Sequence, residues 1–153
     1  MHHRAWLTLA ALAVGCTLDI ANAQDAGKTV IASPNAPVAI GPYSQAIKVG
    51  KTVYLSGQIA IDPKTKQLMA EASIEDQTRR VLENLKAVLS AAGMTLDNVV
   101  STTVFVKDLN DFGKVNEVYA AFFTSAPPAR ATVEVARLPK DAKIEISAIA
   151  SRP

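Results

Sequence analysis

Histidine and cysteine are almost absent from this chain. Its one cysteine is Cys16 and its two histidines are His2 and His3, so neither residue type occurs beyond position 16 of the 153 residues. A chain processed beyond this point has no imidazole and no thiol. That excludes a Ser–His triad, a cysteine nucleophile, a disulfide and an ordinary zinc site. Any catalysis must then use carboxylates, Arg, Lys, Tyr, hydroxyls and backbone groups, and we expect no metal site.

Aromatic residues are also few, and neither sign of charge dominates. Phe, Trp and Tyr make up 5% of the chain, and the net charge is +2 with acidic and basic residues interleaved. This composition predicts no base-stacking platform, no basic stripe for nucleic acid and no polybasic membrane patch. Apolar residues make up 49% of the chain, which suffices for the core of one domain.

The first 23 residues have the organisation of a secretory signal peptide. A short polar segment at 2–4 precedes an apolar run at 5–15, and Ala21-Asn22-Ala23 supplies the small-x-small pattern of a cleavage site. We therefore expect residues 1–23 to be removed before Gln24, residues 24–153 to form a single domain, and the mature protein to be secreted or periplasmic.

A second interpretation of the same region stays open. Ala13-Val14-Gly15-Cys16 loosely resembles a lipoprotein signal, in which Cys16 would be lipidated and become the new N-terminus. The pattern before Gln24 is better formed, because a larger aliphatic residue is commoner at position 13 of lipoprotein signals. We expect attachment to a membrane only if Cys16 is lipidated.

Beyond the leader, hydrophobic periodicity predicts an α+β domain. The pattern predicts strands at 28–31, 46–49, 52–56, 99–106, 130–136 and 143–150, and helices from Ser73 to Gly93 and from Phe112 to Phe123. Strands and helices in this order favour a two-layer domain in which both helices cover one face of the sheet.

The last two predicted strands each carry polar residues on alternate positions. Arg130 and Thr132 share one face of the first strand, and Glu145 lies on the polar face of the second. If a turn at 139–141 joins the strands as an antiparallel hairpin, Arg130 and Glu145 could lie on the same face. Arg130 would offer a planar fork to a carboxylate, and Glu145 could act on a water. A solvated sheet face explains the same alternation, and taken alone the pattern favours that explanation.

Five segments together resemble one known family. They are Ala39-Ile40-Gly41-Pro42-Tyr43-Ser44-Gln45, Leu55-Ser56-Gly57-Gln58-Ile59, Thr103 to Leu109 with Phe112, Val115, Asn116 and Tyr119, Pro128 to Val135, and Leu138 to Ile146. In this order and density they resemble the RidA (YjgF) family over about residues 28–152. The resemblance implies a chorismate-mutase-like fold and a homotrimer with a cleft between each pair of subunits.

The resemblance also implies a reaction that needs no cofactor. RidA proteins hydrolyse 2-aminoacrylate-type enamines, or their imine tautomers, to 2-keto acids and ammonia. Carried over by position, Arg130 would bind the substrate carboxylate, Glu145 would orient the attacking water, and Tyr43 of a neighbouring subunit would close the pocket. The implied substrate-binding residues are Ser56, the Gly57 amide, the backbone of Thr132, and Asn116.

Two departures from the family pattern accompany these roles. Thr132 stands where several members have cysteine, and the loop at 125–127 is shorter than in some members. Export is the larger departure, because the enzymes that generate enamines are mostly cytoplasmic.

Three other functions stay open at this point. The first is a periplasmic binder that holds a small carboxylate or keto acid in the Arg130 cleft without turnover. The second is a general interaction protein, for which the sequence shows no apolar patch that a trimer would leave exposed. A ribonuclease ranks last, because the chain offers neither a histidine base nor a basic groove.

Overall fold

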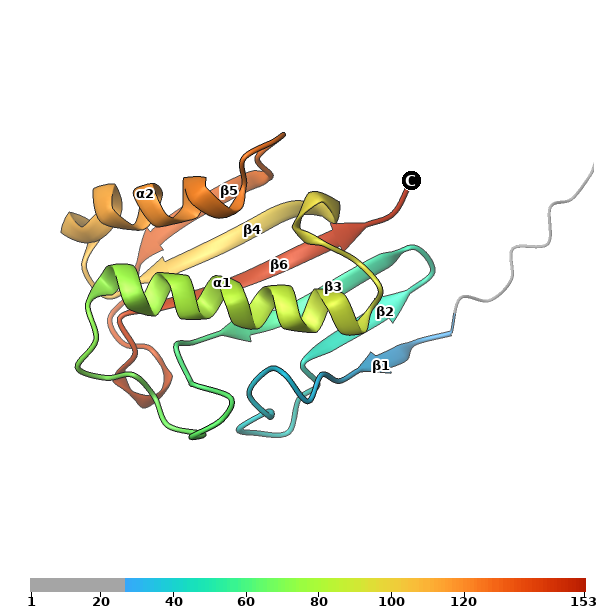
Figure 1. Cartoon of the computed structure of the whole chain (residues 1–153), viewed down its shortest axis with the longest axis horizontal. Coiled ribbons are helices and arrows are strands. Elements are labelled where there is room, and N and C mark those ends of the chain that lie inside the picture. Colours follow the sequence, from blue (N-terminus) through green and yellow to red (C-terminus); the bar gives the residue numbers. More distant parts are fainter. Residues whose placement is uncertain (1–26) are drawn as a thin grey trace, which may run out of the picture.

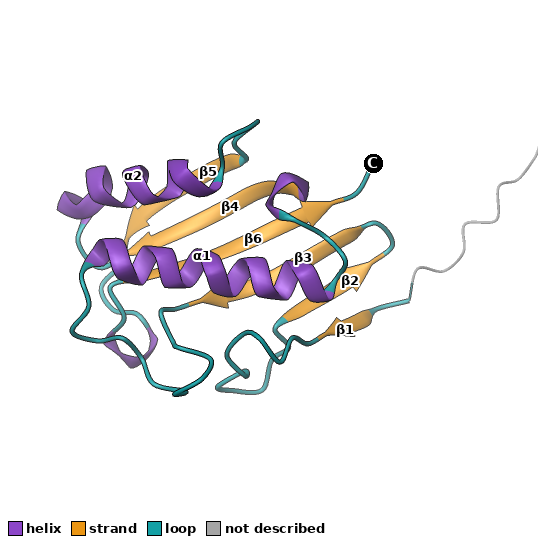
Figure 2. Cartoon of the chain, viewed as in Figure 1, coloured by secondary structure: helices purple, strands orange, loops and turns teal. Residues whose placement is uncertain are grey.

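The computed structural model describes residues 27–153, so the predicted signal peptide, its cleavage before Gln24 and the lipidation of Cys16 lie outside the described residues. A six-stranded mixed sheet carries two helices on one face, as Figure 1 and Figure 2 show. The expected α+β class and two-layer arrangement are confirmed. Within the described residues, no helix has both the length and the apolarity needed to cross a membrane.

The elements follow the chain in nearly the predicted order and extent. The strands are β1 (Thr29–Ile31), β2 (Ala46–Val49), β3 (Thr52–Gln58), β4 (Val99–Val106), β5 (Ala129–Glu134) and β6 (Ile144–Ser151), and the helices are α1 (Ile74–Ala91) and α2 (Phe112–Phe122). Short 3₁₀ turns lie at Leu96–Asn98, Leu109–Asp111 and Pro139–Asp141. Across the sheet the strands are ordered β1-β2-β3-β6-β4-β5.

Helix α1 begins and ends where its local chemistry predicts. The Ser73 side chain accepts a hydrogen bond from the Asp76 amide at 3.1 Å, and Gly93 adopts a φ of +68° just beyond the last turn. Between these ends Leu82, Leu85 and Leu89 are fully buried against the sheet. Their spacing of three and four residues places them on one face of the helix, which therefore forms the centre of the core.

The expected hairpin between the last two strands is wrong. β4 lies between them: it pairs in parallel with β5, Thr102 opposite Arg130, and antiparallel with β6, Phe105 opposite Glu145. The cause is α2, which carries the chain back along the sheet so that β5 must run in the same direction as β4. The segment after β5 then crosses to the other side of β4 before β6 begins.

This pairing places Arg130 and Glu145 on opposite faces of the sheet, and their expected shared face is also wrong. Phe105 of β4 lies opposite both Val133 and Glu145, so these three residues share one face. Arg130 is three positions from Val133, and side chains alternate along a strand. Arg130 therefore faces the helices, and Glu145 faces the uncovered side of the sheet.

Buried amides of α1 hold the long connection after β3. Asn84 donates hydrogen bonds to the carbonyls of Ile59 and Ile61 at 3.2 and 3.0 Å. Gln77 donates to the Met69 carbonyl at 2.9 Å and accepts from the Lys143 amide at 3.1 Å. Both side chains are fully buried, so these bonds satisfy loop carbonyls that water cannot reach.

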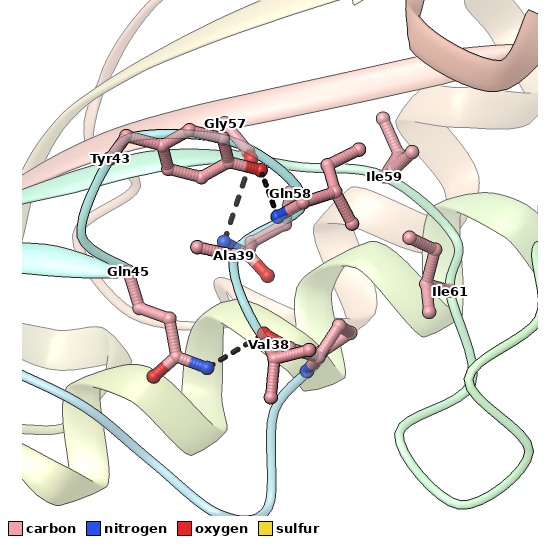
Figure 3. Close-up of a pocket in the computed structure, with 10 residues that line it drawn as sticks. Val38, Ala39, Tyr43, Gln45, Gly57, Gln58, Ile59 and Ile61 are labelled. Carbon is pink, nitrogen blue, oxygen red and sulfur yellow. Dashed lines mark hydrogen bonds between the residues drawn. The ribbon is translucent and has the colours of Figure 1, made fainter.

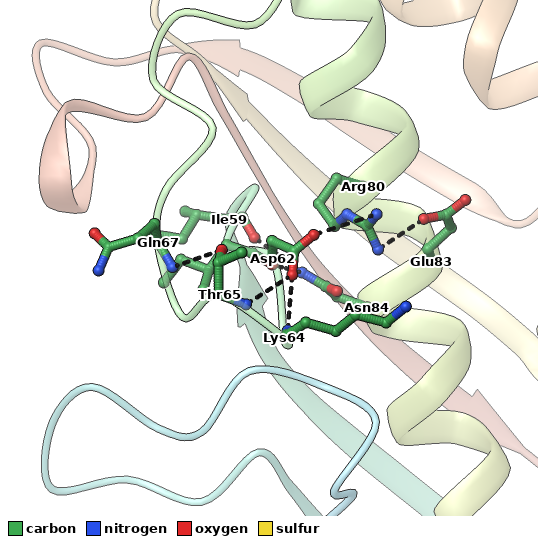
Figure 4. Close-up of polar contacts among 9 residues, drawn as sticks. Ile59, Asp62, Lys64, Thr65, Gln67, Arg80, Glu83 and Asn84 are labelled. Atoms are coloured by element: carbon green, nitrogen blue, oxygen red, sulfur yellow. Dashed lines mark hydrogen bonds and ion pairs between the residues drawn. The ribbon is translucent and has the colours of Figure 1, made fainter.

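At the surface, an ion pair between Asp62 and Arg80 joins the connection after β3 to α1. Asp62 accepts hydrogen bonds from the Thr65 and Lys64 amides, which lower the pKa of its carboxyl, and Arg80 lies 3.9 Å away. Arg80 also pairs with Glu83 at 2.9 Å, and Figure 4 shows this group beside Asn84. Contacts with α1 thus hold the connection between β3 and α1 both at the surface, through Arg80, and in the interior, through Asn84 and Gln77.

The Asn84→Ala variant should therefore lose about 2–3 kcal/mol of unfolding free energy, because two buried carbonyls lose their donor. Urea denaturation of the variant and the wild-type protein measures this loss. Lys86→Ala removes an exposed side chain from the same helix and should change the free energy by less than about 0.5 kcal/mol. Equal effects of the two substitutions would contradict the role given to Asn84.

Candidate active site

Arg130 lies in a cluster of neutral and aromatic side chains. Its Nη2 donates to Asn116 Oδ1 at 2.7 Å, and its guanidinium carbon lies 4.6 Å from the ring centre of Tyr119 and 5.6 Å from that of Phe112. The side chain is half-buried and forms no salt bridge to any residue between 27 and 153. A partly desolvated guanidinium held in this way is prepared to bind an anion.

Tyr119 fixes the ring on which Arg130 rests. Its hydroxyl shares a hydrogen bond of 2.7 Å with the Thr102 hydroxyl of β4, and both residues are buried. Burial raises the pKa of the Tyr119 phenol, which favours its neutral form. Our sequence reasoning assigned Tyr119 no role, although its spacing of three residues from Asn116 on a helix indicated a shared face.

A groove runs from Arg130 along α2. It encloses about 480 Å³ and is lined, besides Arg130, Asn116 and Tyr119, by Ala120, Phe123, Pro127 and Pro128. The polar groups gather at the Arg130 end, and the remaining walls are apolar. Such a groove suits a molecule that carries a carboxylate at one end and an apolar group at the other.

Glu145 lies in a second cleft, on the uncovered face of the sheet. This cleft encloses about 260 Å³ and is lined by Ile40, Tyr43, Ser56, Gly57, Ile59, Pro139 and Glu145. The Glu145 side chain is half-buried and, within the described chain, forms neither a salt bridge nor a hydrogen bond. Burial raises the pKa of its carboxyl above the ordinary value of 4.5. A carboxylate in this state is suited to accept a proton from water.

Position 57 must be glycine for Glu145 to lie where it does. A Cβ on Gly57 would come within 2.7 Å of the Glu145 carboxyl carbon and 2.9 Å of its Cγ. Gly57 also falls where the register of β3 on β6 shifts between Leu55 and Gln58. A bulge of this kind interrupts the ladder and leaves backbone groups free for another partner, which fits the predicted use of the Gly57 amide.

Ser56 and Gln45 hold the loop that carries Tyr43. The Ser56 hydroxyl donates to the Ser44 carbonyl at 2.7 Å, and Gln45 donates to the Pro37 carbonyl at 2.6 Å. Figure 3 shows the amide of Gln45 reaching the backbone beside Val38, with Tyr43 and Gly57 on the other side of the pocket. Because its proton is committed to the loop, the Ser56 hydroxyl can offer only lone pairs to a ligand. Sequence reasoning missed Gln45, which is 6% exposed.

The predicted site residues thus form two groups that one chain does not bring together. Tyr43, Ser56, Gly57 and Glu145 line the cleft on the uncovered face. Arg130 and Asn116 lie on the helix side, and half-buried Thr132 shares their face on β5. β5 is an edge strand, so half of its backbone groups point away from the sheet, as the role predicted for the Thr132 backbone requires. No cluster of three or more His, Cys, Asp or Glu among residues 27–153 could hold a metal ion.

Comparison with known proteins identifies the family. Residues 33–152 match the model of the family described as endoribonuclease L-PSP. A RutC family protein of Pyrococcus horikoshii is 58% identical over 80% of this chain and 97% of its own length. The 2-iminobutanoate/2-iminopropanoate deaminase of Salmonella typhimurium is 57% identical over 80% of this chain and 96% of its own. The chain belongs to the RidA (YjgF) family.

Solved structures of RidA family proteins share the fold. The YjgF gene product of Escherichia coli has a TM-score of 0.78 and 53% identity, covering 82% of this chain and 99% of that one. TdcF of Escherichia coli with bound serine has a TM-score of 0.78 and 47% identity, covering 82% and 99%. The family resemblance drawn from the sequence is confirmed, and deamination of 2-imino acids is an activity named among its members.

The raised pKa of Glu145 predicts a pH-dependent effect on stability. The folded state holds the Glu145 proton more tightly than the unfolded state, so stability is lost as pH rises from about 4.5 through the folded-state pKa. Glu145→Gln removes this loss. In protein diluted to single subunits, the variant should therefore be more stable than the wild-type protein at pH 7 and nearly equal to it at pH 4, as measured by thermal denaturation at both values. Equal stability of the two single subunits at pH 7 would contradict the unpaired state of this carboxyl in one chain.

Proposed function

We propose that this protein hydrolyses reactive 2-imino acids and their enamine tautomers to 2-keto acids and ammonia, in a cleft between two copies of the chain. The observation that carries the proposal is a pair of unused, opposite charges. Arg130 has no carboxylate partner and Glu145 has no cation partner among the described residues, although both are half-buried. A partly buried charge without a partner is stabilised by an oppositely charged group, which a ligand or a second chain can supply.

A homotrimer brings the two groups together in this proposal. Within one chain they face opposite sides of the sheet, so Arg130 of one copy must meet Glu145 of the next. The uncovered face carries exposed apolar side chains that support such contact: Tyr54, Ile149 and Val133 are 50%, 37% and 43% exposed. Burial of side chains of this size is a main driving force for association between subunits. A closed ring would then contain three equivalent clefts.

The reaction needs little more than position. Arg130 binds the substrate carboxylate and holds the iminium carbon near Glu145. Glu145 accepts a proton from a water molecule while the oxygen of that water bonds to the iminium carbon. The product is a tetrahedral aminoalcohol. Glu145 passes this proton to the nitrogen, and the carbon–nitrogen bond breaks with its electron pair on ammonia. The remaining hydroxyl gives its proton to Glu145 and becomes the keto group, and the departing ammonia carries that proton away as ammonium. Because an iminium carbon is already a strong electrophile, no histidine or cysteine is required.

The description of the family as an endoribonuclease does not lead to the same proposal. Ribonuclease activity would need an acid–base pair for phosphodiester cleavage, and the chain has no histidine beyond position 3.

Export of the protein remains a prediction, because it depends on residues 1–23. If it holds, the imine must be supplied by a reaction outside the cytoplasm, such as oxidation of an amino acid.

The Arg130→Ala variant tests the enzyme against the carboxylate binder. An amino-acid oxidase generates imines in the presence of semicarbazide, and deaminase activity appears as reduced semicarbazone formation. We expect the variant to lose more than about 100-fold in kcat/KM, because a charged bidentate contact is lost. Arg130→Lys should recover only a small part. A wild-type protein that 2-ketobutyrate stabilises against heat but that never lowers semicarbazone formation would be a binder.

Mixing two inactive variants tests the composition of the cleft. Arg130→Ala and Glu145→Gln should each be inactive, since every cleft lacks one group. Co-expressed in equal amounts, they should recover about a quarter of wild-type activity, because that share of clefts between random neighbours receives both intact residues. A chain carrying both substitutions, mixed with wild type, controls for dilution. If no activity returns in mixed trimers, the two groups do not act across subunits.

A further inference from the structure

The apolar groove beside Arg130 has no role in the reaction steps above. It begins at the guanidinium, where Asn116 is the other polar lining residue, and continues along Ala120, Phe123, Pro127 and Pro128. In Figure 1 it corresponds to the place where α2 ends and the chain turns back to β5, at the edge of the sheet. A carboxylate bound to Arg130 would therefore direct any attached apolar group into this groove.

Packing and backbone geometry restrict the walls of the groove before any ligand arrives. Phe123 is buried and packs on Tyr119 with ring centres 4.5 Å apart. Pro127 and Pro128 have fixed φ angles, and Ala126 before them adopts a φ of +47°, which non-glycine residues seldom do. A preformed apolar wall binds an apolar group without the entropic cost of ordering a loop.

The size and chemistry of the groove exceed what a methyl side chain would use. Its volume of about 480 Å³ leaves room beyond the carboxylate, and each methylene buried there strengthens binding about fourfold. We propose, on the basis of the deaminase function above, that this groove is the side-chain subsite and that the preferred substrates are 2-imino acids with branched aliphatic or aromatic side chains. Ala120 is then a specificity-determining residue, because its small side chain leaves the groove open.

Ala120 and Ala121 provide a matched pair for the test. Both are exposed on the last turns of α2, but only Ala120 lines the groove. Ala120→Leu should fill the groove, whereas Ala121→Leu adds the same atoms elsewhere on the helix. The imines of phenylalanine and alanine, generated by a D-amino-acid oxidase, serve as the large and small substrates, and semicarbazone loss gives kcat/KM for each.

The wild-type protein should favour the phenylalanine imine by at least about tenfold in kcat/KM. Ala120→Leu should lower kcat/KM for the phenylalanine imine by about tenfold, mainly by raising KM. The same variant should keep kcat/KM for the alanine imine within about twofold of the wild-type value. Ala121→Leu should change neither. Light scattering confirms that each variant keeps the wild-type assembly, and Ala120→Val replaces Ala120→Leu if it does not.

Two results would overturn the inference while leaving the deaminase function intact. One is a wild-type preference for the alanine imine. The other is an Ala120→Leu variant, correctly assembled, that affects both imines equally or neither of them. Absence of any Arg130-dependent turnover would instead overturn the proposed function itself, and the side-chain subsite with it.

Discussion

The position of β4 between β5 and β6 is the constraint on which the arrangement of this molecule depends. Helix α2 makes β5 parallel to β4, while β6 pairs with the other edge of β4. Arg130 and Glu145 consequently project from opposite faces, one into a groove under α2 and one into a cleft on the uncovered side. A single chain therefore keeps the two predicted site residues in separate cavities, and chemistry that uses both of them, as proposed here, would require a second chain.

Arg130 and Glu145 have in common that neither charge has an oppositely charged partner in the described chain. Arg130 is held by a neutral amide and aromatic rings, and burial raises the pKa of the Glu145 carboxyl. Because no such partner is present, burial of the unpaired Glu145 carboxylate reduces the stability of the isolated subunit. A substrate carboxylate on Arg130 and a cationic iminium near Glu145 would supply both missing partners at once. The features that weaken the single chain are those that would favour binding of a small zwitterion-like substrate between chains.

How far the sequence predicted this structure depends on the range of the interactions involved. Ser73, Gly93 and the leucine spacing of α1 are local signals, and they placed that helix correctly. Strand alternation gave the faces of β5 and β6 separately, but it carries no information on which strand lies between them, and the hairpin was wrong for that reason. The site residues came from family resemblance. Helical spacing placed Tyr119 on the same face as Asn116, but its role was missed because its contacts with Arg130 and Thr102 are tertiary. Gln45 was missed because a buried loop anchor likewise depends on tertiary contacts.

The residues that would distinguish an enzyme from a carboxylate binder in this fold are those of the Glu145 cleft. Arg130 alone would retain any small carboxylate, reactive or not, so carboxylate binding cannot separate the two. The Glu145 carboxylate forms no salt bridge and no hydrogen bond within the described chain, and Gly57 has no side chain that would displace it. Ser56 and Gln45 hold the loop of Tyr43, which lines the same cleft. A site that only retained a carboxylate would gain nothing from a second, desolvated carboxylate nearby, since like charges repel. A site that must direct a water at an iminium carbon needs one.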